Sequence, residues 1–270
     1  TAATIKIFPK PKAKKTVIIK LKNIASALAS LKYIQTSTGN GIEAFEIMTK
    51  PILEIIHKQF PNFQKPFQKI PNLLAIVEFI NFSEYEVKVQ KNGQTLFEEK
   101  VLNLFEELFN LGLIEDGVIA QSISQSKEIW DIRENANIAQ KQEGYQIKLD
   151  VSLPIHKIEE FCYDTEKKLI EEYPKIRICS FGHLGDGNLH YNLMGETGED
   201  QIFYDKRKSF EKIVYKNVFN LNGSFSAEHG IGQLKKNELK LYKDQNSLNL
   251  MREIKSLIDP ENIFNPGKVF

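Results

Sequence analysis

The stretch HLGDGNLHYN, residues 183–192, places two histidines on either side of a glycine-rich turn. Its centre, Asp186-Gly187, favours a tight hairpin loop because Asp-Gly pairs tolerate positive φ. With these two residues in the loop, His183 faces His190 across the strand pair, and their Cβ atoms lie about 5 Å apart. Imidazoles at this separation are close enough to share one metal ion. The stretch therefore predicts a metal-binding hairpin, with a polar surface hairpin as the alternative.

The composition is that of an ordinary globular protein. The chain has 270 residues, 41% hydrophobic and 26% charged, which is enough for one large core or two small ones. The 36 basic and 35 acidic residues nearly cancel, which argues against a nucleic-acid or membrane-surface partner. Cys162 and Cys179 are too few for a disulfide framework and indicate buried thiols in a reducing compartment. No apolar run approaches the roughly 20 residues that a membrane helix needs.

Hydrophobic periodicity and turn signals predict an α+β fold on either side of this hairpin. Two βαββαβ units fit the order of elements, with an antiparallel sheet covered by helices on one side. A Pro/Lys connector, 9–15, follows a first strand that lacks an initiator Met, so we expect the C-terminal part of a longer protein. The predicted strands are 1–8, 16–21, 44–48, 74–79, 118–122, 145–153 and 176–181, and the predicted helices are 24–35, 95–111, 126–140, 155–172 and 201–221, with a helical pattern from 233 to 259.

The segment SAEHGIG, residues 226–232, is the second candidate for chemistry. Glu228 completes a His/His/Glu set with His183 and His190, and three protein ligands with an open position are typical of a catalytic divalent metal. The adjacent His229 points elsewhere and is a candidate general base. The alternative is a surface loop with Glu228 in solvent. Asn192 joins the candidates because it shares a sheet face with His190.

Two cations form a third candidate site, for a carboxylate. Arg133 lies on the helix predicted at 126–140, and Lys148 interrupts an apolar strand, where an unpaired charge is costly. An arginine presents a bidentate fork to a carboxylate. The alternative is a local charge pair between Lys148 and Asp150, or an edge-strand charge. The C-terminal NPGK, which begins at Asn265, reads from composition alone as a polar tail.

Taken together, the motifs resemble the C-terminal substrate domain of FAD-linked 2-hydroxyacid dehydrogenases, the group of D-lactate dehydrogenase, the glycolate oxidase flavoprotein subunit and D-2-hydroxyglutarate dehydrogenase. The matching stretches are GHLGDGNLH at 182–190, SAEHGIG at 226–232, IDPENIFNPGK at 258–268 and the segment from Arg133 to KLDVSLP at 148–154. The first twelve residues resemble the junction that leaves the flavin domain. This likeness spans essentially the whole chain.

The resemblance implies a duplicated ferredoxin-like antiparallel sheet covered by helices, with a C-terminal helical segment. It divides the chain into a junction at 1–15, a substrate or cap domain at 16–220, and a metal and active-site loop with helices at 221–270. An N-terminal FAD-binding domain that carries the Gly-rich pyrophosphate loops precedes this region in the family, and we find no such loop here. FAD is then held mainly by that domain.

The same resemblance assigns roles to individual residues. His183, His190 and Glu228 match the family's ligands to a divalent metal, with zinc as our expectation, and His229 matches its active-site base. Asn137 stands where relatives that take a dicarboxylate can carry Thr, which leaves the distal-group specificity open. Arg133 and Lys148 match residues that hold the substrate carboxylate. Asn192 matches a residue near the substrate, and Asn265 matches a position that contacts the flavin ring edge.

The implied reaction is the oxidation of a D-2-hydroxyacid to a 2-oxoacid, with hydride transfer to FAD. A metal-dependent hydrolase stays open as an alternative, because a His/His/Glu site with a base also activates water, and so does a non-catalytic metal-binding module. The resemblance leaves the electron acceptor unidentified and allows a homodimer. It implies a location in the cytoplasm or at the periphery of the inner membrane, or in the mitochondrial matrix of a eukaryote.

Overall fold

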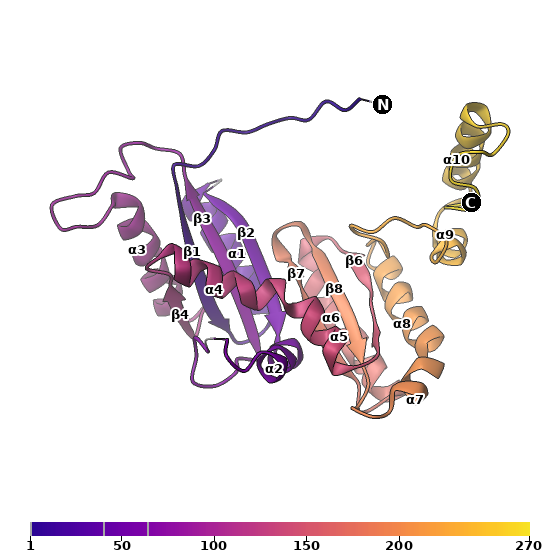
Figure 1. The fold of residues 1–270 in the computed structure, drawn as a ribbon, viewed down its shortest axis with the longest axis horizontal. Helices are drawn as coiled ribbons and strands as arrows, with labels where there is room; N and C mark the ends of the chain where they lie inside the picture. The colour runs from indigo at the N-terminus through magenta and orange to yellow at the C-terminus, as the bar shows by residue number, and fades with distance from the viewer. Residues whose placement is uncertain (1, 40, 64) are drawn as a thin grey trace.

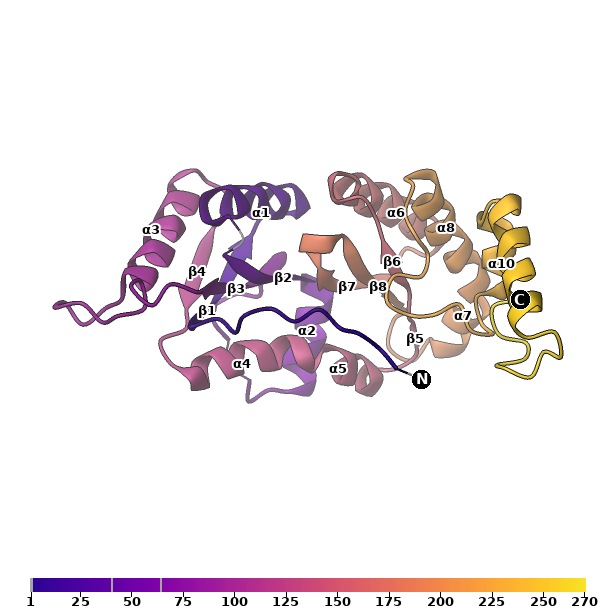
Figure 2. The same cartoon turned by 90° about the horizontal axis from the view of Figure 1, so that it is seen from above.

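The computed structural model describes residues 2–39, 41–63 and 65–270, and its centre is an antiparallel sheet with helices on both faces (Figures 1 and 2). Seven of the eight strands run in the order β4-β1-β3-β2-β7-β8-β5, and the eighth, β6, also pairs with β8. The two halves of this sheet meet where β2 pairs with β7. The predicted α+β class is confirmed.

The first half of the sheet is a βαββαβ unit whose strands lie in the order β4-β1-β3-β2. Both of its crossover helices begin with a side-chain cap. The side chain of Asn23 accepts the backbone N–H of Ser26, and that of Thr95 accepts the backbone N–H of Glu98. A further helix, α2, is inserted between β2 and β3. The elements are β1 (Ala13–Leu21), α1 (Ile24–Thr38), β2 (Ile42–Thr49), α2 (Lys50–Gln59), β3 (Leu73–Asn81), α3 (Leu96–Asn110) and β4 (Asp116–Ile119).

The second half repeats this plan, and its fourth strand is reduced to the isolated bridge between Ser152 and Ser224. The two halves are joined by the helices α4 (Ile123–Glu134) and α5 (Ala136–Glu143). Its elements are β5 (Gln146–Ile147), β6 (Asp150–Ser152), the 3-10 turn η1 (Ile155–Lys157), α6 (Ile158–Glu172), β7 (Arg177–His183), the 3-10 turn η2 (Leu184–Asp186), β8 (Asn188–Met194), α7 (Asp200–Asp205) and α8 (Arg207–Asn220). The duplicated ferredoxin-like arrangement that the resemblance implied is present.

Alternate residues of each strand enter two separate cores. The first core lies under α1, α3, α6 and α8 and takes Val17, Ile47 and Tyr191 from the sheet. The second core lies under α2, α4 and α5, on the opposite face, and takes Ile18 and Phe181. Figure 2 shows the two sets of helices on either side of the sheet. The prediction that helices cover one side was therefore wrong, because α2 and the connection between the halves pack on the second face.

The first predicted strand is also wrong. Residues 2–8 have no regular secondary structure, and Ile5 and Ile7 are exposed, because no neighbouring strand pairs with them; Thr1 lies outside the described residues. The predicted strand at 145–153 is divided into β5 and β6 around Lys148. The predicted helices at 126–140 and 201–221 are each broken, at Asn135 and Lys206.

The C-terminal segment forms two helices beyond the sheet, α9 (Lys236–Tyr242) and α10 (Gln245–Ile258) (Figure 1). Leu257 and Ile258 leave much of the apolar surface of α10 exposed, whereas Leu248 is buried. Within the described ranges, no helix is both long enough and apolar enough to cross a bilayer.

Candidate functional site

The hairpin that carries the two histidines has a longer turn than predicted. Strand β7 ends at His183, the 3-10 turn η2 follows, and Gly187 adopts a left-handed conformation with φ 79°. In the ladder His190 lies opposite Phe181, not opposite His183. The reason is local bonding in the turn, where the Asp186 carboxylate accepts the N–H of Asn188 at 3.2 Å. The predicted two-residue loop and its register are wrong by two positions.

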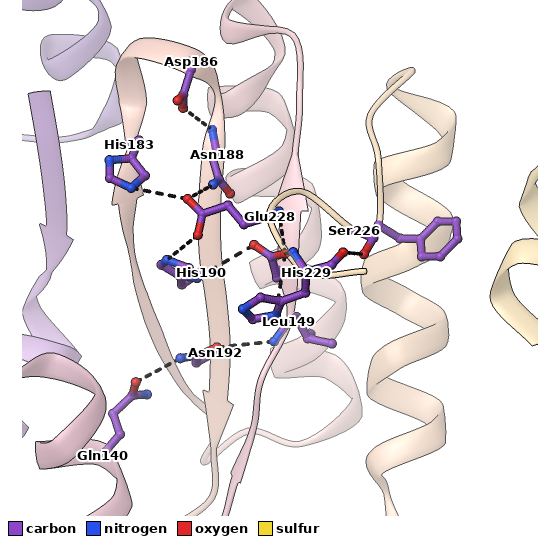
Figure 3. Close-up of polar contacts among 12 residues, drawn as sticks. Gln140, Leu149, His183, Asp186, Asn188, His190, Asn192, Ser226, Glu228 and His229 are labelled. Carbon is purple, nitrogen blue, oxygen red and sulfur yellow. Dashed lines mark hydrogen bonds and ion pairs between the residues drawn. The ribbon is translucent and has the colours of Figure 1, made fainter. Parts of the chain in front are cut away.

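A register difference of two residues keeps the same side chains on the same face, because the side-chain period of a strand is two. Phe181 lies two residues before His183 in β7 and belongs to the second core, as does Met194 four residues after His190. Both histidines therefore project from the second face of the sheet. The side chain of Glu228 extends from its loop towards both imidazoles (Figure 3).

The carboxylate of Glu228 lies between the two imidazoles. Its Oε1 is 3.4 Å from Nε2 of His183, and its Oε2 is 4.0 Å from Nε2 of His190. Asn188 donates to Oε1 at 2.6 Å and orients the group. Tetrahedral zinc with bonds of about 2.1 Å places its ligand atoms about 3.4 Å apart. The three side chains are thus gathered, although no group of three His, Cys, Asp or Glu in the described part of the chain has the full spacing of a metal site.

A buried aspartate holds the Glu228 loop on the sheet. Asp150 lies opposite His190 in the β6–β8 ladder, and its Oδ2 accepts the backbone N–H groups of Glu228 and His229, both at 2.8 Å. Lys235 supports the loop from the other side by donating to the carbonyl of Phe225 at 2.8 Å, and burial lowers the pKa of this lysine. These contacts fix the direction of both consecutive side chains.

The imidazole of His229 lies beside this aspartate and near His190. Its Nδ1 is 3.7 Å from Oδ2 of Asp150, and the ring centroids of His190 and His229 are 6.4 Å apart (Figure 3). The side chain is 60% exposed, which leaves it open to a ligand. The prediction that His229 points away from Glu228 agrees with this geometry.

Arg133 reaches the site from α4 and is held there by a buried carboxylate. Its Nε donates to Oε2 of Glu46 at 2.7 Å, and its guanidinium lies 4.7 Å from the ring centroid of Phe181. Nδ1 of His183 contacts the other oxygen of Glu46. Burial opposes the charge of Glu46, but its contacts with His183 and Arg133 outweigh burial and lower its pKa.

The two histidines differ in electrostatic environment. The contact with Glu46 raises the pKa of His183 against the opposing effect of burial. Burial lowers the pKa of His190, and the nearby charge of Arg133 acts in the same direction. A neutral imidazole is the form that binds a metal ion.

The second predicted cation, Lys148, lies on a different side of the site from Arg133. It is exposed between β5 and β6 and lines a cavity of about 540 Å³ together with His229, Arg207, Lys235 and Lys268. This position breaks the strand that the sequence predicted, and no ion pair joins Lys148 to Asp150 among the described residues.

The three predicted asparagines have different environments. Asn192 is buried, and its side chain accepts the N–H of Leu149 at 3.3 Å and donates to Gln140 at 2.9 Å (Figure 3). Asn137 is exposed on α5, and the break at Asn135 separates its helix from that of Arg133. Asn265 is exposed in the C-terminal loop with φ 47°.

Two buried carboxylates, Glu46 and Asp150, were missed by the sequence analysis. Glu46 interrupts the otherwise apolar run AFEIM at 44–48, and a buried charge in such a run requires partners. That signal was available, but the partners His183 and Arg133 are far away in sequence. Asp150 was considered only as a partner of Lys148.

A comparison with protein families matches the profile of "FAD linked oxidases, C-terminal domain" to residues 10–269. The chain belongs to this family of FAD-linked oxidase C-terminal domains. The mitochondrial D-2-hydroxyglutarate dehydrogenase of Rattus norvegicus is 29% identical over 271 residues, which cover 99% of this chain and 47% of that protein. The D-2-hydroxyglutarate dehydrogenase of Xanthomonas citri pv. viticola is 34% identical over 231 residues, which cover 85% of this chain and 46% of that protein. The chain thus spans about half the length of these relatives.

The solved structures support the same fold for this FAD-linked oxidase domain. The crystal structure of p-cresol methylhydroxylase with substrate bound superposes with a TM-score of 0.65 over 97% of this chain and 53% of that chain, at 10% sequence identity. At this identity the likeness concerns the fold alone.

Proposed function

We propose that this chain is the substrate- and metal-binding half of a flavin-dependent dehydrogenase that oxidises a D-2-hydroxyacid to a 2-oxoacid. The observation that carries the proposal is the convergence of His183 and His190 on Glu228, with His229 on the same face, in a member of the FAD-linked oxidase family. The names of the relatives favour D-2-hydroxyglutarate as substrate. Family membership also favours a dehydrogenase over a metal-dependent hydrolase.

His183, His190 and Glu228 would hold a divalent metal ion. Two imidazole nitrogens and one carboxylate oxygen form a donor set that suits zinc. The separation of 4.0 Å between His190 and Glu228 is wider than a closed site, but the Glu228 side chain is 46% exposed and has room to adjust. A divalent ion supplies a Lewis acid that lowers the pKa of a hydroxyl group it binds.

The remaining residues act on the substrate. Arg133 and Lys148 are proposed to bind carboxylate groups, and Asn137, which is exposed on the next helix, is proposed to face the distal group of the substrate. His229 is exposed beside the metal ligands and is proposed to take the proton of the 2-hydroxyl group. Asn192, two residues after His190 on the same strand, is proposed to lie near the substrate. FAD, when bound, would supply the acceptor for the hydride that leaves C2 of the substrate.

The proposed domain plan keeps the junction at 1–15, the cap domain at 16–220 and the loop with its helices at 221–270. Asn265 is proposed to contact the flavin, which an N-terminal FAD-binding domain would mainly hold. The exposed apolar side chains of α10 are consistent with such a contact. The mitochondrial matrix is the proposed compartment for a eukaryotic source, and the rat relative is named as mitochondrial; otherwise we propose the cytoplasm or the inner-membrane periphery.

The test of the reaction is dye reduction by the purified full-length protein. D-2-hydroxyglutarate, D-lactate and their L enantiomers are supplied with an artificial electron acceptor. We expect reduction with a D enantiomer and formation of the corresponding 2-oxoacid. Absence of reduction with every D-2-hydroxyacid, in a protein that contains flavin, contradicts the proposal.

The test of the metal is elemental analysis of the full-length protein and its Glu228→Ala variant. We expect stoichiometric zinc in the wild type and strong loss in the variant. Glu84→Ala is the matched control, because Glu84 is exposed and far from the site in a surface ion pair. Equal metal content in wild type and Glu228→Ala would refute this ligand.

A further inference from the structure

Each proposed ligand histidine presents its two ring nitrogens to two different carboxylates. Nε2 of His183 and Nε2 of His190 both face Glu228. Nδ1 of His183 faces Glu46, and Nδ1 of His190 faces Asp150. The carboxylates on the Nδ1 side are buried, whereas Glu228 is about half exposed. The site is therefore lined on its inner side by two buried acids that the proposed chemistry does not use.

Glu46 belongs to the first half of the sheet and pairs with His183 across the β2–β7 junction. Its side chain is 1% exposed, so both carboxylate oxygens need donors from the protein. Oε2 accepts the Nε–H of Arg133 at 2.7 Å. Oε1 contacts Nδ1 of His183 and has no other hydrogen-bond partner among the described residues. An acceptor at Nδ1 requires the proton of a neutral imidazole to lie on Nδ1 and leaves a lone pair on Nε2.

Asp150 has the same relation to His190 in the second half. Oδ2 is occupied by the backbone N–H groups of Glu228 and His229. Oδ1 is buried without a hydrogen-bond partner among the described residues, and it lies 3.9 Å from Nδ1 of His190. A rotation of the His190 ring that closes this distance would supply the missing donor and would again place the proton on Nδ1.

We propose that Glu46 and Asp150 are a pair of positioning carboxylates that hold His183 and His190 as Nδ1–H tautomers, so that both Nε2 lone pairs point at the metal position beside Glu228. This inference rests on the metal site proposed above, because that site gives the tautomers a function. The contacts between the carboxylates and the histidines do not depend on a bound ion. Carboxylates behind ligand histidines orient the ring and raise its basicity.

The amide variants Glu46→Gln and Asp150→Asn should reverse these tautomers. In each case the existing donors retain the oxygen of the new amide, because Arg133 needs an acceptor at Glu46 and two backbone N–H groups need one at Asp150. The amide nitrogen then faces Nδ1 of the histidine. A donor at that place favours the proton on Nε2, where it blocks metal binding.

The test is long-range proton–nitrogen NMR on the full-length protein, labelled with nitrogen-15 at histidine, treated with chelator and held at about pH 9, where imidazoles are neutral. His183→Gln and His190→Gln assign the signals. We expect Nδ1–H tautomers for both histidines in the wild type. A wild-type Nε2–H tautomer at either histidine overturns the role of the acid behind it, whether or not a variant folds.

The variants extend the test to zinc. Glu46→Gln should shift only the His183 signals to the Nε2–H pattern, Asp150→Asn only those of His190, and each should weaken zinc binding in calorimetry by about 10–100-fold. Glu78→Gln removes a sheet carboxylate that contacts Thr16 and should change neither readout. Unchanged tautomers overturn the inference. Reversed tautomers in a protein that binds no zinc even as wild type sustain the positioning role and refute the metal site instead.

Discussion

Arg133 donates its Nε–H to the buried carboxylate of Glu46 at 2.7 Å, so one edge of the guanidinium is occupied by the protein itself. Its terminal nitrogens make no hydrogen bond within the described residues. Arg133 thus neutralises a carboxylate in the sheet, and the substrate carboxylate that we propose it binds would contact its outer edge.

The first prediction concerns the stability of this pair. Arg133→Met leaves the charge of Glu46 with His183 as its remaining partner, and we expect a loss on the order of 2–4 kcal/mol in the free energy of unfolding. Adding Glu46→Gln removes the charge that has lost its partner. The double variant should therefore lose at least about 1 kcal/mol less free energy of unfolding than the two single variants lose together. Urea unfolding measures both. Additive effects would show that the two side chains are not coupled.

The second prediction separates the kinetic roles of His229 and Arg133 in the full-length enzyme. His229→Ala should mainly lower kcat, by roughly 10²–10⁴-fold, because a general base acts as the bond breaks. Arg133→Met should mainly raise KM by about one to two decades, because a carboxylate contact exists in both ground and transition states. Lys22→Met, on the exposed surface, is the control. Normal kcat in His229→Ala would assign the base to another group, and normal KM in Arg133→Met would leave Lys148 as the next candidate.

The third prediction compares two glycines of the hairpin turn. Gly187 has φ 79°, and an added Cβ would lie 2.1 Å from the carbonyl oxygen of Leu153, whereas one at Gly185 meets no atom within 4 Å. Gly187→Ala should therefore cost at least about 2 kcal/mol, and Gly185→Ala less than about 0.5 kcal/mol. Urea unfolding of the two variants at equal concentration checks this. Equal midpoints would mean that the turn is not built as described.

The fourth prediction concerns pH and Glu143, at the end of α5. Burial opposes its charge, but hydrogen bonds from Lys58, Arg177 and Gln59 outweigh burial and lower its pKa to about 2. The unfolded pKa is higher, so the stabilisation is complete above about pH 4.5 and is lost as the pH falls towards about 2.

Glu143→Gln should therefore destabilise the protein by about 2 kcal/mol at neutral pH. This value is lower than the full pKa shift implies, because solvent around the exposed Lys58 screens its charge. The difference from wild type should shrink as the pH falls from about 4.5 to 3 in urea titrations. Exposed Glu84→Gln should stay within about 0.5 kcal/mol throughout. A difference that does not depend on pH would assign the loss to packing.

Local patterns in the sequence determined the α+β class, the main helices and strands, and the two segments that carry His183, His190 and Glu228. Periodicities of 3.6 and 2 and turn residues act over a few positions, so they can be read without the fold. The face on which His183 and His190 lie was also determined locally, because the strand period of two survives a register difference of two.

The tertiary structure alone decided the helices on the second face and the carboxylates behind the histidines. The register of the hairpin follows from bonding within the turn, which the predicted two-residue loop left out. Glu46 reaches His183 because β2 of the first half pairs with β7 of the second. The two residues are 137 positions apart in the sequence. Asp150 faces His190 through the same kind of long-range pairing. Such contacts depend on which strands become neighbours, and burial in the assembled sheet then turns two ordinary acids into partners for the site.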